Sequence, residues 1–309
     1  MAAERSRPAV EAFRFRRLEK PEEFRQVGEL CEAVWGSSAA GGVPPALMRA
    51  LQDNGGLVLG AFADIYLAGT AVSLLGWDGT TLYHYSHLTV VRPEYQNHHL
   101  GFRLKAFQRD EVLKLGLPEI RETFDPLQSR AASLLVRRLG ARPDRYFPHY
   151  YGQLADTANA GMETDRLRVV WSINSDRVAA RMAGGPPSSE ELRELWRKST
   201  PLIETEPGES GLRVPTSVQE TSEPSAHLEI PFDLESIREH EPASVRRWRH
   251  AVRDAFRIAF DTGYSVEDFG VLAPEHERRS FYLLSKSPGS AQSVPPPTGP
   301  GAPSGSASP

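Results

Sequence analysis

Two different hydrophobic periods follow each other between residues 83 and 115, and they predict the centre of the fold. The segment from Tyr83 to Val91 is rich in aromatic and β-branched residues, which is typical of a buried strand. Pro93 ends that strand because proline cannot donate a hydrogen bond to a sheet. Apolar residues then recur at roughly helical spacing before a glycine stop, and they are Leu100, Leu104, Phe107, Val112 and Leu115. The sequence therefore predicts a strand, a short loop and a helix.

The segments on either side continue in a mixed order of strands and helices. Before this stretch, the periods predict strands at 13–18, 57–63 and 68–76 and helices at 21–34 and 46–52. After it, they predict a strand at 119–124, a helix that Asp125 caps and that ends near Arg138, and a strand at 145–150. This order favours an α/β (α+β) fold, with a mixed twisted sheet of about six or seven strands and helices on both faces.

The C-terminal part predicts a second set of elements. Strands are expected at 168–173, 227–231, 266–272 and 280–285, and helices at 189–198 and from Pro242 to Gly263. Residues 199–224 are rich in Pro, Glu, Ser and Thr and are expected to form a long surface loop. No flexible linker interrupts residues 150–170, so this α+β extension is expected to pack on the first part.

The expected division of the chain has four parts. A flexible N-terminus covers residues 1–10, a first domain 11–165, the extension 166–286, and a Pro/Ser/Gly tail 287–309. The tail is expected to be disordered because it has almost no apolar side chains to bury.

The amino-acid composition excludes several classes of function. The chain has 309 residues, of which 39% are hydrophobic, so a sizeable core is expected. Its formal charge of −4 provides no general attraction to nucleic acid or to anionic membranes. Cys31 is the single cysteine, which excludes an intramolecular disulfide. With neither a secretory signal nor an apolar run of membrane-spanning length, a cytoplasmic location is expected.

The predicted strand, loop and helix form an arrangement that binds anions. The first N–H groups of a helix lack partners within the helix, and its dipole is positive at that end. A phosphate group is therefore expected at the start of the helix at Leu100.

The loop itself carries a family resemblance. The residues Val91-Arg92-Pro93-Glu94-Tyr95-Gln96-x-x-His99-x-Gly101 resemble the acyl-CoA signature of the GNAT acyltransferase superfamily. Further segments resemble a poorly characterised branch of that superfamily with a long C-terminal extension. They are Gln108-Arg109, Thr123-Phe124-Asp125-Pro126-Leu127, Leu139-Gly140-Ala141, Tyr151-Gly152, Asn159-Ala160-Gly161-x-x-Thr164-Asp165-Arg166, Glu229-Ile230-Pro231, Trp248-Arg249 and Gly263-Tyr264.

Three positions depart from the pattern of that branch. His99 stands where the loop normally has its first glycine, and Ala131 and Leu135 stand where the branch has asparagines. The ring and Cβ of His99 come to a place where backbone normally approaches pyrophosphate closely.

The resemblance implies a GNAT domain that uses acetyl-CoA or another acyl-CoA as co-substrate and no metal. The implied contacts are with the pyrophosphate and with the pantetheine, which would pair with the free edge of the central strand. The residues implied in them are Thr89, Val91, Gln96, Asn97, His98, His99, Leu100, Gly101 and Phe102.

Three residues are candidates for acid or base roles. His87 lies on the central strand, where it could face the thioester, and its ordinary pKa near ~6.5 suits a base; the alternative is a hydrogen-bonded core histidine. Tyr85 shares its face and is either a general acid or a packing residue. Asp125 is either catalytic or a helix cap. Val136 stands where the superfamily often has a helical tyrosine acid, so solvent or Tyr151 would have to replace it.

These observations give two hypotheses from different classes. The first is a cytoplasmic GNAT N-acyltransferase that moves an acetyl or other acyl group from CoA to a primary amine of a small molecule, with an amino acid as one acceptor considered. The second is a catalytically weak or inactive GNAT-fold protein that binds acyl-CoA or regulates. The expected partner is the small-molecule amine, with neither nucleic acid nor membrane, and a homodimer is left open.

Overall fold

The computed structural model describes residues 13–36, 43–96, 98–152, 162–273 and 277–286. The expected flexible N-terminus at 1–10, the expected tail at 287–309 and the candidate Asn97 therefore lie outside the described residues.

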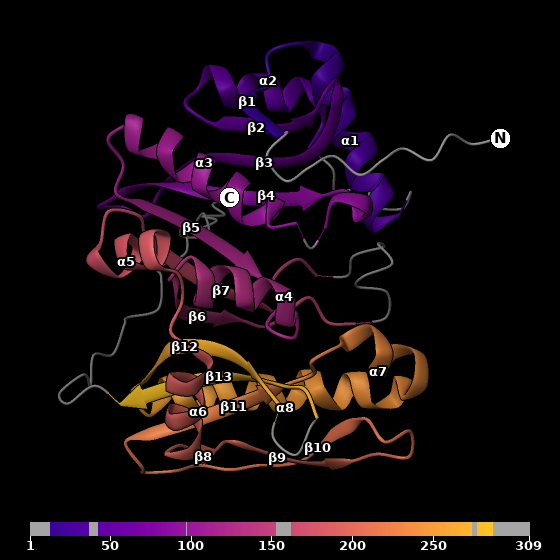
Figure 1. The fold of residues 1–309 in the computed structure, drawn as a ribbon, viewed down its shortest axis with the longest axis vertical. Coiled ribbons are helices and arrows are strands. Elements are labelled where there is room, and N and C mark those ends of the chain that lie inside the picture. Colours follow the sequence, from indigo (N-terminus) through magenta and orange to yellow (C-terminus); the bar gives the residue numbers. More distant parts are fainter. Residues whose placement is uncertain (1–12, 37–42, 97, 153–161, 274–276, 287–309) are drawn as a thin grey trace, which may run out of the picture.

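A seven-stranded sheet forms the N-terminal half (Figure 1). Its strands, in spatial order, are β1 (Phe13–Arg17), β2 (Leu57–Ala63), β3 (Tyr66–Trp77), β4 (Leu82–Val91), β5 (Glu119–Phe124), β7 (Arg166–Ser172) and β6 (Arg142–Phe147). Neighbouring strands are antiparallel except β4 and β5, which are parallel. The predicted mixed sheet is thus confirmed.

Helices cover both faces of this sheet because its strands bury side chains on both sides. Every residue of β2 is buried. Leu57, Leu59 and alternating residues pack in a core with helix α3 (Leu100–Lys114). Val58 and Phe62 pack in another core with helices α1 (Pro21–Trp35) and α2 (Pro45–Asp53). A strand that buries side chains on both faces of the sheet needs helices on both sides, so the sheet lies between two layers of helices.

The extension has its own sheet. Its strand order is β12 (Tyr264–Leu272), β13 (Arg279–Lys286), β11 (Ser225–Ile230) and β8 (Thr200–Pro201), and a hairpin of β9 (Ile203–Pro207) and β10 (Arg213–Val218) lies beside it. The helices of this part are α5 (Asp176–Gly184), α6 (Ser189–Arg197), α7 (Leu234–His240) and α8 (Pro242–Asp261).

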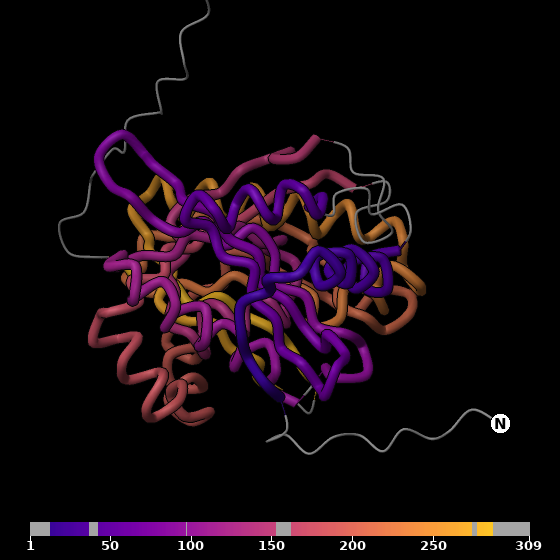
Figure 2. The backbone as a smooth tube through the Cα atoms, turned by 90° about the horizontal axis from the view of Figure 1, so that it is seen from above, coloured from indigo at the N-terminus to yellow at the C-terminus, as the bar shows by residue number. Residues whose placement is uncertain are grey.

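The extension packs on the N-terminal half, as expected. Seen from above, it lies beneath the first sheet (Figure 2). One continuous core contains Trp171 of the first sheet together with Phe256 and Tyr282 of the extension. The Tyr282 hydroxyl donates to the Pro126 carbonyl at 2.9 Å, and the Ser129 and Ser280 hydroxyls are 2.8 Å apart. Buried bonds of this kind fix how the two parts meet.

Several local features of the structure differ from the sequence expectations. Residues 199–224 contain β8, β9 and β10 rather than one long loop, because Ile203 and Val214 are buried. Helices α5 and α7 were not predicted. Strand β7 lies inside the first sheet, between β5 and β6, although it begins beyond the expected boundary at 165.

The expected N-cap role of Asp125 is also wrong. The helix begins later, as α4 (Ser129–Ala132) with Gln128 at the N-cap, and continues as the π-helical turn η3 (Ser133–Arg138). The Asp125 carboxylate instead accepts the Leu127 amide at 2.9 Å in the turn before the helix.

Candidate active site

Strands β4 and β5 separate in the middle of the first sheet. They are paired at His84↔Ile120, Tyr85↔Arg121 and Ser86↔Glu122. Beyond Ser86, β4 continues to Val91 beside β3, and β5 continues to Phe124 beside β7. The backbone of residues 87–90 therefore loses its partner strand on one side, which leaves N–H and C=O groups for another molecule.

A bulge marks the point of separation. On β3, Val72 faces Leu88 and the next residue, Ser73, faces Ser86, so His87 is the extra residue of β4. Such a bulge bends a strand and redirects its side chains and amides. Together, the bulge and the missing partner give β4 a short stretch of irregular, unpaired backbone.

The loop after β4 is held by bonds of its own. A short 3₁₀ turn, η2, covers Pro93–Tyr95. The Gln96 amide donates to the Pro93 carbonyl at 3.2 Å, and the Gln96 side chain donates to the Val91 carbonyl at 3.1 Å. Arg130 donates to the same side chain at 3.4 Å. Gln96 therefore shapes the loop, and both its own N–H and the Val91 carbonyl already have partners.

His99 has the backbone conformation that usually favours glycine. Its φ is +59°, in the left-handed region, and it is the N-cap residue of α3. The loop thus retains its glycine-like shape although the glycine is replaced. The exposed ring accepts a hydrogen bond at Nδ1 from Arg138 Nη1 at 2.8 Å, and that guanidinium lies 4.9 Å from the Phe102 ring.

The start of α3 has the features of an anion site. Its N-cap His99 makes no side-chain bond to the first helical amides. A Cβ at Gly101 would meet only Leu134, at 3.6 Å, so the backbone there is open. Arg130 and Arg138 flank the loop through their contacts with Gln96 and His99. Helix dipole, amides and two guanidinium groups all favour a negatively charged group here.

Thr89 provides a second sign of a missing partner. It lies on the unpaired part of β4, and its Oγ1 is buried without a hydrogen-bond partner among the described residues. Buried hydroxyl groups almost always have a partner in native proteins. The Thr89 hydroxyl is therefore available for a hydrogen bond to a bound ligand.

Tyr85 and His87 lie together near the splay. Their ring centroids are 6.5 Å apart. The Tyr85 hydroxyl is 2.9 Å from Thr123 Oγ1, which is 3.5 Å from the Tyr151 hydroxyl. Burial raises the pKa of Tyr85 well above its ordinary value, so the phenol stays protonated.

His87 is exposed, and its side chain makes no hydrogen bond within the described part of the chain. Partial burial of the ring lowers its pKa below the ordinary value near 6.5, so the imidazole is neutral at pH 7 and can accept a proton. The neighbouring His84, in contrast, is a buried structural residue between Ser73 Oγ and the Gly55 carbonyl.

The third candidate, Asp125, is engaged elsewhere. Arg249 of α8 donates from Nη1 to Oδ1 at 2.7 Å and from Nη2 to Oδ2 at 2.6 Å. Burial lowers the pKa of Arg249, but the Asp125 carboxylate more than offsets this, and the net pKa is raised. Asp125 thus joins β5 to the extension through a buried ion pair, and its oxygens are occupied by that pair.

Several site residues were missed by sequence reasoning. Arg138, Arg130 and Thr123 reach the site from segments distant in sequence, and their spacing carried no signal. His98 is half-buried next to His99.

Among the described residues, no group of three or more metal-ligating side chains could hold a metal ion, and no helix is long and apolar enough to cross a membrane.

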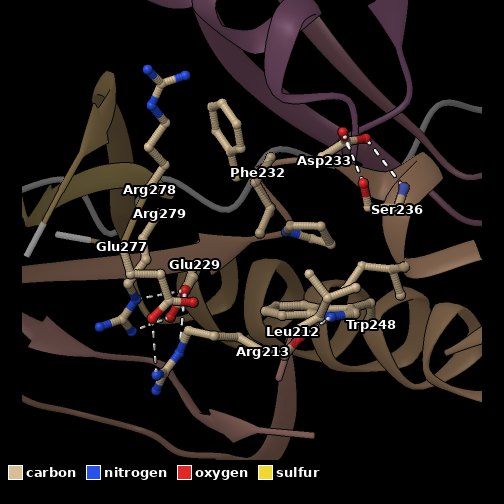
Figure 3. A pocket seen from close by; sticks show the side chains of 13 residues that line it. Leu212, Arg213, Glu229, Phe232, Asp233, Ser236, Trp248, Glu277, Arg278 and Arg279 are labelled. Atoms are coloured by element: carbon tan, nitrogen blue, oxygen red, sulfur yellow. Dashed lines mark hydrogen bonds and ion pairs between the residues drawn. The ribbon is translucent and has the colours of Figure 1, made fainter. Parts of the chain in front are cut away.

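A separate cavity of about 340 Å³ lies in the extension (Figure 3). Four of its lining residues belong to segments that resemble the C-terminal extension of the GNAT branch: Glu229, Ile230, Pro231 and Trp248. Its charged wall is internally paired, since Arg279 donates to Glu229 and Arg213 lies 3.6 Å from Glu277. This pairing neutralises most of the charge that a ligand could use.

Solved acetyltransferase structures align with about half of this chain. The ribosomal-protein-S18-alanine N-acetyltransferase from Escherichia coli is 18% identical, with a TM-score of 0.43 over 53% of this chain and 95% of its own. A chain of the NatC complex, bound to Gag peptide and CoA, is 15% identical, with a TM-score of 0.42 over 52% of this chain and 98% of its own. A GNAT-family acetyltransferase from Streptococcus pneumoniae is 17% identical, with a TM-score of 0.41 over 51% of this chain and 98% of its own.

No protein-family model and no curated protein matches this sequence. The mixed sheet expected from the sequence forms roughly the N-terminal half of the chain, and the remaining half is an additional α+β unit.

Proposed function

We propose that this protein is an acyl-CoA-dependent N-acyltransferase that acts on the primary amine of a small molecule, with amino acids as the first acceptor class to test. The observation that carries the proposal is the separation of β4 from β5 directly before the loop that begins α3. This places unpaired strand backbone and an anion-binding helix start on one continuous stretch of chain, Ser86 to Phe102. Acyl-CoA has matching chemistry, with amides along its pantetheine arm and a diphosphate beyond it.

The binding residues have separate roles. The amides at Leu100, Gly101 and Phe102 hold the diphosphate, assisted by Arg130 and Arg138. The strand backbone near Thr89 pairs with the pantetheine arm, and the Thr89 hydroxyl supplies one further hydrogen bond. Gln96 and His99 act through the shape of the loop, and His98 and Val91 border it.

The nitrogen of the amine attacks the thioester carbonyl of acyl-CoA and forms the C–N bond. The C–S bond then breaks, and CoA leaves as a thiolate that takes up a proton from solvent or from the protonated His87. The acceptor amine has to be neutral to attack, and His87 is the base that removes its proton, directly or through one water molecule. A backbone N–H at the bulge of β4 stabilises the negative charge that develops on the carbonyl oxygen, an effect commonly worth ~3–4 kcal/mol where such a donor can be removed. Tyr85, held by Thr123, lines the cleft beside His87 and fixes the orientation of the acceptor.

The second candidate is a GNAT-fold protein that binds acyl-CoA without turnover. Specific observations favour it: the phenol of Tyr85 is a poorer acid than usual, Asp125 is held by Arg249, and Val136 is wholly buried in the core. None of these residues can readily protonate a leaving thiolate.

A single set of titrations separates these candidates. The protein is titrated with acetyl-CoA and with succinyl-CoA by calorimetry, and thiol release is then followed across a panel of amines that includes amino acids. Binding with amine-dependent thiol release supports the acyltransferase, and binding without release from any amine supports the regulatory alternative. Absence of binding to either acyl-CoA contradicts both.

A further inference from the structure

Lys105 is a fully buried lysine that has no part in the binding contacts or the chemistry proposed for the site. It lies on α3 with none of its surface exposed. Its ammonium donates to Ser86 Oγ on β4 at 3.0 Å and to Glu122 Oε2 on β5 at 2.5 Å. The same nitrogen lies 5.7 Å from the Trp171 ring on β7.

The two partners of Lys105 occupy a special position in the sheet. Ser86 and Glu122 face each other as the last pair of the parallel ladder between β4 and β5. The ammonium therefore bridges the two strands at the point where they separate. Gln108, one turn further along α3, donates to the same Ser86 hydroxyl at 3.3 Å.

Lys105 also connects this point to the start of its own helix. It lies four residues after Gly101, one helical turn from the amides at the beginning of α3. Movement of α3 along the sheet would break both ammonium contacts. The bridge therefore fixes two distances at once, the opening between the strands and the position of the helix start above it.

Stability alone is a weak reason for this arrangement. Replacing a buried ion pair by apolar residues of similar volume is often neutral or stabilising, because desolvation opposes the attraction. An apolar side chain cannot form hydrogen bonds to two strands, so it cannot hold them at a fixed separation. The location at the last pair of the ladder points to a positioning role.

We propose that Lys105 is the positioning residue that sets the cleft between β4 and β5 for acyl-CoA. It bonds to Ser86 and Glu122, holds the strands together up to this pair, and keeps the α3 amides in register with the unpaired part of β4. The proposal rests on the proposed function in that the ligand is taken to be acyl-CoA. The bridge itself can be tested without a ligand.

The test compares three variants with the wild-type protein. Lys105→Met removes the bridge and keeps most of the volume. Lys105→Met/Glu122→Leu removes both charges, so that no carboxylate is left stranded. Arg181→Met is the matched control, because Arg181 makes an equally buried ion pair with Asp268 at 2.8 Å in the extension. Acetyl-CoA affinity is measured by calorimetry, and backbone hydrogen exchange is followed for residues 84–90 and 119–124.

We expect Lys105→Met to bind acetyl-CoA at least tenfold more weakly and to exchange faster at both segments, with KM rather than kcat changed if turnover is found. The double variant recovers melting temperature but not affinity, which a merely structural role would not produce. Arg181→Met loses stability and keeps the wild-type dissociation constant.

Three results would overturn the positioning role: unchanged affinity in Lys105→Met, recovery of affinity with stability in the double variant, or an equal loss of affinity in Arg181→Met. If the wild-type protein binds no acyl-CoA, the proposed function fails, and hydrogen exchange alone decides about the bridge. Faster exchange confined to the two segments in Lys105→Met then supports it, and wild-type exchange rejects it.

Discussion

The ion pair between Asp125 and Arg249 joins the two halves of the molecule, and its two single variants should differ in cost. Breaking a buried pair by removing one partner typically costs ~3–5 kcal/mol, because the other charge is left without compensation. The loss of stability depends on how far the unpaired charge can still reach solvent or other hydrogen-bond partners. Arg249 and Asp125 differ in both respects.

Asp125→Ala strands the more deeply buried partner. The Arg249 side chain is 1% exposed, and its Nε has no hydrogen-bond partner among the described residues even with Asp125 present. We expect a loss at the upper end of the range, about 5 kcal/mol. Arg249→Met strands Asp125, which is 11% exposed and keeps the bond from the Leu127 amide. Methionine also fills most of the volume, so we expect about 3 kcal/mol.

The assay is urea denaturation at pH 7 for the wild type, both single variants and the double variant Asp125→Ala/Arg249→Met. The coupling energy of this cycle should be clearly favourable, since the double variant leaves no stranded charge. Because one core spans both halves, a single transition is expected. A cost below about 1 kcal/mol for Arg249→Met, or a larger cost than for Asp125→Ala, would show that the buried charges are not stranded in this way.

Three further predictions concern single residues. His99→Gly removes the strain of a left-handed backbone but loses the Arg138 contact, so the free energy of unfolding should stay within about 1 kcal/mol of wild type. Calorimetry should show tighter CoA binding. Equal or weaker affinity would contradict the expected crowding of the pyrophosphate by the imidazole. Thr89→Val removes a buried hydroxyl that has no partner among the described residues, so protein stability should be unchanged or higher. Acetyl-CoA binding should become several-fold weaker. Lower stability with unchanged affinity would show that the partner of the hydroxyl is water and not the ligand. Burial lowers the pKa of His227 to about 4, below its unfolded value near 6.5, so its stability contribution is present above pH 6.5 and is lost as the pH falls toward 4. His227→Gln should remove about 3 kcal/mol of that dependence in denaturation curves recorded between pH 7 and 4, and an unchanged slope would argue against a neutral buried imidazole.

The sequence predicted the elements whose pattern is local. The strand before Pro93 and the helix after His99 are seen in apolar periods and in proline and glycine positions, and α1 and α8 likewise begin at predicted prolines. Residues 199–224 were misjudged because polar composition outweighed a few buried positions such as Ile203 and Val214. Those side chains are buried only because the extension folds over them.

The site was predictable in part for the same reason. The loop and the start of α3 form one continuous stretch, so their residues could be named from sequence. Asp125 looked like a cap because Asp-Pro favours a helix start, but Arg249, 124 residues away, takes its carboxylate. The contacts of Arg138 with His99 and of Lys105 with two strands are likewise products of tertiary structure and carry no local signal.

The start of α3 offers a direct test of the proposed diphosphate site. Gly101→Asp adds a carboxylate in the first turn of α3, where the helix dipole favours it and a Cβ fits 3.6 Å from Leu134. The same carboxylate would repel a diphosphate bound to these amides. Gly28→Asp in α1, where a Cβ meets nothing within 4 Å, is the matched control.

The decisive measurement is the calorimetric titration of wild type, Gly101→Asp and Gly28→Asp with acetyl-CoA. The account predicts binding to wild type and to Gly28→Asp, and loss of binding in a Gly101→Asp protein that unfolds at the same or a higher urea concentration. Binding of acetyl-CoA by Gly101→Asp with wild-type affinity would contradict the claim that the amides at the start of α3 hold its diphosphate.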